Sequence, residues 1–291
     1  MTVEHSFSLE MGTLVLYNEE KGGVQMSQDS AVDFFFRQRW PDGFRCPSCA
    51  HRDYSLIRTR TLPLYQCRSC KRQTSVTSGT VMHKTRTPLK TWADAIEALS
   101  SSHGLNAKQL AASIGCTHKV AWGMLTKFRA SIEAIESARR LEGNVHVGLR
   151  SLAPKYIWIF LPNRHYRCER VVSVGASVDA SGQPTAIKLL TVSRRELIED
   201  HKEPTNEGRR RIVADTARRP EDAVWHNGWR RFPDTLNDCF REARGWLIQT
   251  YNGIGTRRLH SYLSEYCYRW NAAAQGVALR DEWLRLCFPM G

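Results

Sequence analysis

The sequence predicts a multidomain α+β protein, and three observations support this. The chain has 291 residues, enough for two or three domains at about 100–200 residues each. Four cysteines form two closely spaced pairs near the N-terminus, with the spacing of a metal site. Helical periodicity then gives way to strand-like segments, which are followed by further helices. We therefore expect a small metal-stabilised module, a helical module and a larger α/β domain.

Composition excludes several classes of protein. A hydrophobic share of 42% with 24% charged residues is ordinary for a globular chain and excludes wholesale disorder. The most apolar run, Tyr156–Leu161, has the length of a strand, far short of the ~18 residues of a membrane helix. The N-terminus lacks the pattern of a secretory signal. Nine cysteines, an odd and clustered set, favour a reducing cytoplasm over a disulfide scaffold. We expect a cytoplasmic protein with no membrane partner.

The charge balance predicts a polyanionic partner. Lysine and arginine number 42 against 29 aspartates and glutamates, a net charge of +13. A protein this basic commonly binds nucleic acid, although a generic basic enzyme remains an alternative on composition alone.

The cysteine pairs predict a zinc site at Cys46, Cys49, Cys67 and Cys70. Their pattern is C-x2-C-x17-C-x2-C, within the window of four-thiolate zinc ribbons. Each two-residue gap lets two sulfurs face one ion, and a short hairpin between the pairs brings them together. Its strands are expected at Tyr54, Leu56, Ile57, Leu62, Leu64 and Tyr65. Four protein thiolates leave no open position for water, so we expect a structural Zn²⁺.

The middle of the chain predicts a helix-turn-helix. Asn106 is suited to cap a helix whose buried stripe includes Leu110 and Ile114. Gly115 stands where a tight turn needs a residue without a side chain, and Thr117 is suited to cap the next helix. An ordinary helical hairpin with a solvated basic face is equally compatible with this pattern. The net charge and the adjacent ribbon favour DNA binding.

The second helix of this motif divides into an inner and an outer face. The inner face is expected to bury Val120 or Ala121, Met124, Leu125 and Phe128. The outer face carries the candidate DNA-binding residues, which are Thr117, His118, Lys119, Trp122, Lys127 and Arg129. The first four lie at the start of the helix, where side chains reach base edges. The last two lie further along and are expected to contact phosphates.

The C-terminal half predicts strands followed by helices. Strands are expected at 144–152, 156–161, 168–178 and 184–192, with a turn at 179–182. Helices are expected at about 193–201, 235–246 and 256–271, and a last helix after Asn271 is expected to dock or dimerise.

The chain resembles a known family from about Phe34 to Asn271. The resemblance is densest in RWPDGFRCPSC (39–49), SVTSGTVMHKTRTPLKTW (75–92), HNGWRRF (226–232) and YNGIGTRRLHSYLSEYCYRWN (251–271). These blocks, in this order, resemble the zinc-ribbon transposases of bacterial insertion sequences, the ISXO group. The resemblance implies a catalytic domain of RNase H fold with an Asp-Asp-Glu triad, whose carboxylates hold two divalent metals.

The resemblance also implies that this chain has lost most of that triad. The position of the first acid holds Gly148, and that of the second holds Asn227. The third falls on Asn237 or Asp238, and the count does not decide between them. Glycine offers no ligand, and a neutral amide lacks the charge that a hard dication requires. We therefore expect no catalytic Mg²⁺ and no enzyme activity, unless carboxylates elsewhere replace the triad, the candidates being Glu142, Asp215, Asp222 and Glu242.

The leading hypothesis is a sequence-specific double-stranded DNA-binding protein, a transcriptional regulator derived from a transposase and associated with the bacterial nucleoid. The alternatives are an active transposase with diverged acids that acts on inverted-repeat ends, and an interaction protein for a protein or RNA partner. No small-molecule substrate is expected, and homo-oligomerisation is left open. The expected domains are an N-terminal extension (1–28), a zinc ribbon with its preceding helix (29–86), a helix-turn-helix domain (87–140), a degenerate RNase H-like domain (141–271) and a C-terminal tail (272–291).

Overall fold

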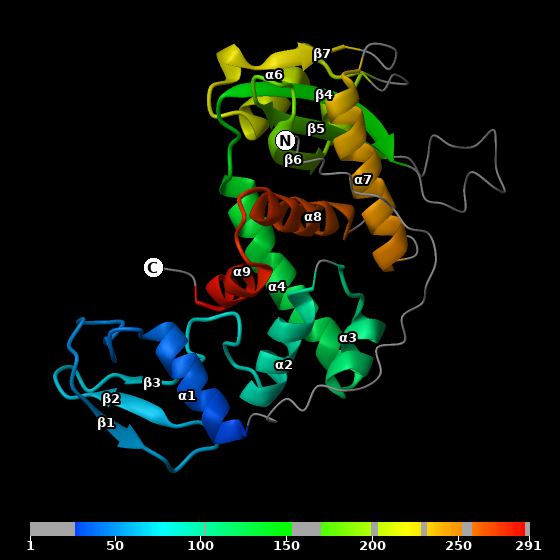
Figure 1. The fold of residues 1–291 in the computed structure, drawn as a ribbon. Helices are drawn as coiled ribbons and strands as arrows, with labels where there is room; N and C mark the ends of the chain where they lie inside the picture. The colour runs from blue at the N-terminus through cyan, green and yellow to red at the C-terminus, as the bar shows by residue number, and fades with distance from the viewer. Residues whose placement is uncertain are drawn as a thin grey trace, which may run out of the picture.

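The computed structural model describes residues 27–101, 103–152, 170–198, 203–227, 232–251 and 258–288. The expected strand at 156–161 and most of the HNGWRRF block lie outside the described residues. Figure 1 shows a small ribbon module at one end, a group of helices in the middle and a sheet with flanking helices at the other end. No described helix has the length and apolar character needed to span a membrane.

The N-terminal module is one helix packed on a small antiparallel sheet. Helix α1 (Gln28–Arg39) precedes strands β1 (Tyr54–Ile57), β2 (Leu64–Cys67) and β3 (Gln73–Thr74), which pair in that order. The expected hairpin between the cysteine pairs is confirmed, because β1 pairs with β2 across it. Aromatic rings join the helix to the sheet. Each of these five rings has at least three of the others within 6.3 Å: Phe36, Trp40, Phe44, Tyr54 and Tyr65.

Three helices follow the ribbon: α2 (Leu89–Leu99), α3 (Ala107–Ile114) and α4 (His118–Ala138). The two expected helices of the helix-turn-helix are α3 and α4. Helix α4 continues well beyond the predicted motif and ends next to the C-terminal sheet (Figure 1).

The C-terminal helix α9 (Leu279–Cys287) returns to this N-terminal half. Its Trp283 ring lies 5.1 Å from the ring of Phe128 in α4, which in turn lies 5.5 Å from Trp92 in α2. One buried cluster therefore includes the ribbon, α2–α4 and α9, and it crosses the boundary expected after residue 86. The tail helix docks on its own chain.

The C-terminal domain contains a four-stranded sheet in the order β6-β5-β4-β7. Its strands are β4 (Asn144–Leu152), β5 (Arg170–Val178), β6 (Pro184–Thr191) and β7 (Val224–His226). Strands β4, β5 and β6 pair antiparallel, whereas β7 pairs parallel to β4. The described parts of three expected strands are confirmed, and β7 was not expected.

Helices cover both faces of this sheet (Figure 1). Helix α6 (Asn206–Thr216) contributes to the buried cluster on one face. Helices α7 (Asp234–Tyr251) and α8 (Leu259–Ala274) contribute to the cluster on the other. The expected helix at 193–201 is wrong, because the described part holds only a short 3-10 turn, η2 (Arg194–Glu196), followed by an extended Leu197.

Candidate zinc centre and nucleic-acid interface

The four predicted zinc ligands converge at the end of the ribbon. All four sulfur atoms lie within 4.8 Å of one another, with Cys46 Sγ 3.5 Å from Cys70 Sγ and Cys49 Sγ 3.6 Å from Cys67 Sγ. Zinc–sulfur bonds of about 2.3 Å in a tetrahedron place the sulfurs about 3.8 Å apart, close to these separations. The quartet therefore fits one structural Zn²⁺.

The two knuckles that present the sulfurs have the same backbone geometry. The amide of Ala50 donates to the carbonyl of Cys46 at 2.9 Å, and the amide of Lys71 donates to Cys67 at 3.1 Å. Ala50 and Lys71 follow the second cysteine of each pair and have φ values of 58° and 59°. Each knuckle thus holds a non-glycine residue in the left-handed region, at a cost of about 1–2 kcal/mol that the metal site offsets.

The pKa values of Cys46 and Cys70 shift in opposite directions. Burial opposes the Cys46 thiolate, but backbone hydrogen bonds from Cys49 and Ser48 outweigh it and lower the pKa of Cys46 to about 6. A backbone hydrogen bond from Arg72 lowers the pKa of Cys70, but the neighbouring thiols reverse this and raise it to about 11. Four thiolates this close repel one another, and a bound dication removes that penalty.

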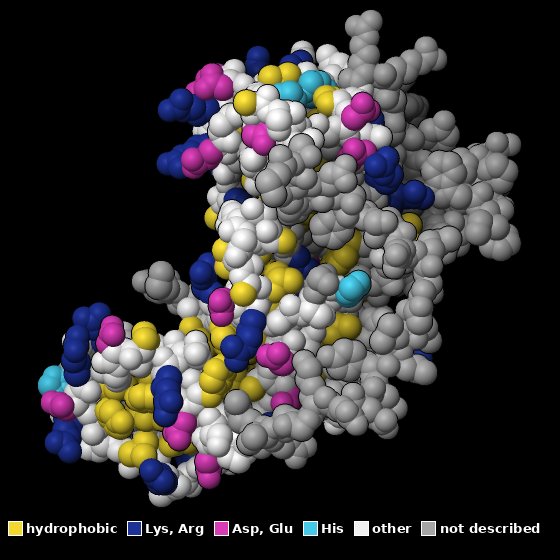
Figure 2. Space-filling view, viewed as in Figure 1, with side chains coloured by type: hydrophobic (Ala, Val, Ile, Leu, Met, Phe, Trp, Pro, Cys, Tyr) yellow, Lys and Arg dark blue, Asp and Glu magenta, His cyan; other side chains and the backbone are white. Residues whose placement is uncertain are grey.

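The ribbon also carries much of the positive charge. Residues 27–86 contain eleven lysines and arginines against four aspartates, a net formal charge of +7. Figure 2 shows these basic side chains around the rim of the ribbon. The exposed basic residues from the first knuckle to the second are Arg45, Arg52, Arg58, Arg60, Arg68, Lys71 and Arg72. A surface of this charge attracts phosphates.

The predicted caps of the α3–α4 motif are confirmed. The Asn106 side chain accepts hydrogen bonds from the backbone of α3 and forms a capping box with Gln109. Gly115 has φ 64° and ψ 36°, the left-handed conformation that the turn requires. Thr117 Oγ1 accepts from the amide of Val120 at 3.4 Å and caps α4.

The start of α4 presents the predicted outer face to solvent. His118 and Lys119 are exposed, and Trp122 keeps 40% of its surface exposed, which is unusual for so large an apolar ring. Lys127 is half-buried, and its ammonium donates to the carbonyl of His83 at 2.9 Å, so it links α4 to the end of the ribbon module. The inner-face residues Ala121, Met124, Leu125 and Phe128 are buried, as predicted.

Arg129 requires a correction, because it is buried in the protein and not presented to phosphates. Its Nε donates to Glu265 Oε2 at 2.8 Å, and Nη2 donates to the Tyr251 hydroxyl at 3.0 Å. Only 10% of the Arg129 side chain is exposed, and Glu265 has none. We therefore withdraw Arg129 from the predicted DNA-binding residues.

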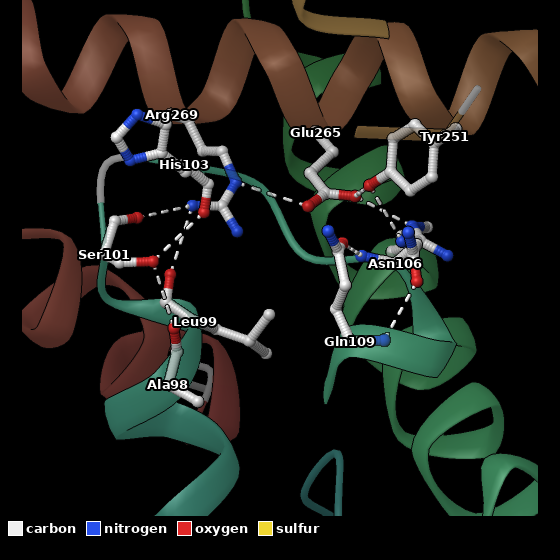
Figure 3. Close-up of polar contacts among 10 residues, drawn as sticks. Ala98, Leu99, Ser101, His103, Asn106, Gln109, Tyr251, Glu265 and Arg269 are labelled. Atoms are coloured by element: carbon white, nitrogen blue, oxygen red, sulfur yellow. Dashed lines mark hydrogen bonds and ion pairs between the residues drawn. The ribbon is translucent and has the colours of Figure 1, made fainter. Parts of the chain in front are cut away.

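This ion pair belongs to a network that joins helices α2–α4 to the C-terminal domain (Figure 3). Glu265 in α8 also accepts from Arg269, whose Nη1 donates to the carbonyls of Leu99 and Ser101 at the end of α2. The Asn106 amide donates to the carbonyl of Thr250 at the end of α7, at 3.0 Å. The α2–α3 connection is therefore fixed to α7 and α8.

The positions implied for the catalytic triad lie on β4, directly after β7 and on α7, and β4 contacts both of the other elements. Gly148 in β4 pairs with His226 in β7, so their side-chain positions share the sheet face that α7 covers. A Cβ atom on Gly148 would lie 2.3 Å from Cε2 of Phe232. The Phe232 ring thus occupies the space where the first acid would project.

Nitrogen-bearing side chains of β4 and β7 lie on the same sheet face as Gly148. The Arg150 guanidinium stacks 3.3 Å from the Phe232 centroid and makes a long contact of 3.4 Å to Oδ1 of Asn237. His226 Nε2 lies 3.2 Å from His146 Nδ1, and burial together with His146 lowers the pKa of His226. The corner therefore favours a neutral His226 imidazole near one guanidinium, that of Arg150.

The remaining triad candidates have other partners. Asp238 forms an exposed ion pair with Arg241 at 2.8 Å, and the Asn227 Oδ1 accepts from the Trp225 indole at 2.5 Å. Two of the possible replacement acids also form ion pairs, Asp215 with Arg140 and Glu142 with Arg218. Within the described residues, the cysteine quartet is the only group of three or more potential metal ligands that gather together.

One comparison identifies the ribbon. Residues 26–73 match the transposase zinc-ribbon domain of the IS1595 type. The match covers α1 and the four predicted ligand cysteines, and it agrees with the resemblance in the first sequence block. Comparisons with curated proteins and with solved structures find no match to the chain.

Filling the space at Gly148 should destabilise the protein without creating a nuclease. We expect Gly148→Ala to lower the free energy of unfolding by about 1–3 kcal/mol, because the new methyl group overlaps the Phe232 ring. Gly123→Ala in α4 is the matched control, since nothing lies within 4 Å of its Cβ position. It should stabilise the helix by about 0.5–1 kcal/mol. Urea unfolding of both variants tests the pair, and equal stability would contradict the packing of Phe232.

Proposed function

We propose that this protein is a transposase-derived, sequence-specific double-stranded DNA-binding protein that acts as a regulator and does not cut DNA. The transposase zinc ribbon, with its exposed basic rim, supports nucleic-acid binding. The α3–α4 motif supports sequence recognition, because a capped second helix presents His118 and Lys119 at its exposed start. A regulator of this kind acts on the nucleoid.

The C-terminal sheet supports descent from an RNase H-like domain. Three antiparallel strands are followed by one strand parallel to the first, with helices on both faces, as the resembled family implies. In such a domain the acids project from the first strand, from the end of the parallel strand and from a following helix. The equivalent places here hold Gly148, Asn227 and α7.

The proposal that the protein does not cut DNA rests on the Phe232 ring, which packs against Gly148. Two-metal phosphodiester cleavage needs carboxylates that hold cations beside the scissile phosphate. At this corner an aromatic ring fills the space of the first acid, and the Arg150 guanidinium stacks on that ring. A cation already present at the site opposes the binding of a second cation. DNA binding depends on other surfaces, so it persists without metal binding at this corner.

Mapping the genomic DNA that the protein binds in cells tests the regulatory part. A regulator gives a small set of discrete sites at promoters. Binding confined to the ends of a repeated element would instead favour an active transposase.

Lys119 tests whether α4 is the recognition helix. Losing a base contact should cost roughly 1–3 kcal/mol at the bound site and relax preference at one base pair. We therefore expect Lys119→Ala to bind the mapped fragment more weakly and to discriminate less well against a scrambled duplex. Arg218→Ala is the control, because that arginine follows α6 at the opposite end of the molecule (Figure 1). Parent-like affinity and specificity of Lys119→Ala would exclude this residue as a reader.

A further inference from the structure

We propose that Arg258, stacked on Trp122, is a phosphate-binding residue, so that the DNA interface includes the start of α8 as well as the helix-turn-helix. The inference rests on the DNA-binding function proposed above. The Arg258 guanidinium lies 5.0 Å from the centroid of the Trp122 ring. Arg258 is exposed at the N-terminal end of α8, and Trp122 is exposed one turn into α4.

The stack explains an otherwise costly exposed tryptophan. Trp122 lies four positions after His118 and three after Lys119, so all three share one stretch of the α4 surface. An arginine on an aromatic face is held in place, while the donors on the edge of its guanidinium stay free for a phosphate. The pair thus places a preorganised cation beside the residues predicted to face bases.

The rest of the α4–α8 contact fixes this placement. Ser261 Oγ donates to Glu133 Oε2 at 2.6 Å, and Arg129 pairs with Glu265 deeper in the interface. These contacts hold α8 against α4 at two further points along the interface. Arg258 therefore does not depend on the cation–π contact alone to stay near α4. In this arrangement Trp122 is a positioning residue that acts through Arg258. This role replaces the contact with base edges that was predicted for Trp122.

The test measures the affinity of the full-length protein for a mixed-sequence duplex as a function of salt. Removing one phosphate contact reduces the slope of log affinity against log salt by about one unit and lowers affinity about fivefold at 0.15 M salt. We expect this full loss for Arg258→Ala and a smaller loss for Trp122→Leu, which keeps the cation but not the ring that positions it. The double variant should be no weaker than Arg258→Ala alone. Arg258→Lys keeps the charge but loses the planar stacked group, so it should recover only part of the affinity. Arg218→Ala should match the parent.

Thermal unfolding midpoints check that these exposed substitutions leave the fold intact. If Arg258→Ala binds like the parent while Lys119→Ala is weakened, the composite interface is wrong and the helix-turn-helix function stands. Additive losses in the double variant would show that Trp122 does not act through Arg258, which also overturns the proposal. If the parent itself has no affinity for duplex DNA, the proposed function fails before this inference is reached.

Discussion

Cys46→Ser is expected to abolish zinc binding and unfold the ribbon. Structural zinc in small modules contributes about 10–16 kcal/mol of apparent binding free energy, which matches or exceeds the entire stability of a typical domain. The parent should contain one zinc per chain by elemental analysis, and the variant should contain none. Because the ribbon shares a buried cluster with α2–α4 and α9, protease sensitivity should extend into the helical module.

Cys116→Ser provides the control for this experiment. Cys116 lies in the α3–α4 turn, outside the quartet, and is half-buried. Its replacement should leave zinc content at one per chain. A gently purified parent without zinc, or a Cys46→Ser variant that retains zinc and a cooperative unfolding transition, would contradict the zinc centre.

Arg129→Met should cause the largest loss of stability outside the zinc site. Removing one partner of a buried ion pair costs about 3–5 kcal/mol, because the other charge stays buried. Glu265 has no exposed surface, and among the described residues Arg269 would be its remaining ionic partner. Arg241→Met is the matched control, since its pair with Asp238 is exposed and should contribute about 0–1 kcal/mol. Urea midpoints measure both, and an equal effect would contradict the buried network.

The Arg129–Glu265 ion pair also predicts how the stability of the protein depends on pH. Burial alone raises the pKa of Glu265, but Arg129 and Arg269 outweigh it and hold the pKa below its ordinary value of 4.5. A carboxyl group whose pKa is lower in the folded than in the unfolded protein stabilises the fold. That stabilisation is complete above the unfolded pKa and is lost as pH falls through the folded pKa. The parent should therefore lose stability below about pH 4.5, and Arg129→Met should lose less over that interval.

Local features of this fold were predictable because their causes are local. The two-residue gap between cysteines determines a knuckle, and the backbone of the turn selects Gly115. The side chains of Asn106 and Thr117 bond to amides two or three residues away. These interactions require no knowledge of the rest of the chain, so the zinc ligands and the helix caps were predicted correctly.

Features that depend on distant segments were not predictable. Arg129 has the spacing of an outer-face residue on α4, and its burial depends on Glu265, 136 positions later. Strand β7 has only three residues and is defined by its pairing with β4. Helix α6 contains a run of arginines that suggests a solvated loop. Thr205 caps it, and Ile212 packs on the sheet.

The most direct test of the central claim is to incubate the protein with its mapped DNA fragment and either Mg²⁺ or Mn²⁺, and to measure binding and strand nicking together. We predict a stable complex with no nicking or strand transfer above the metal-free level, because Phe232 and Arg150 occupy the corner where carboxylates would hold the metals. Metal-dependent nicking that Asp238→Ala abolishes would contradict this account and identify the protein as an active transposase.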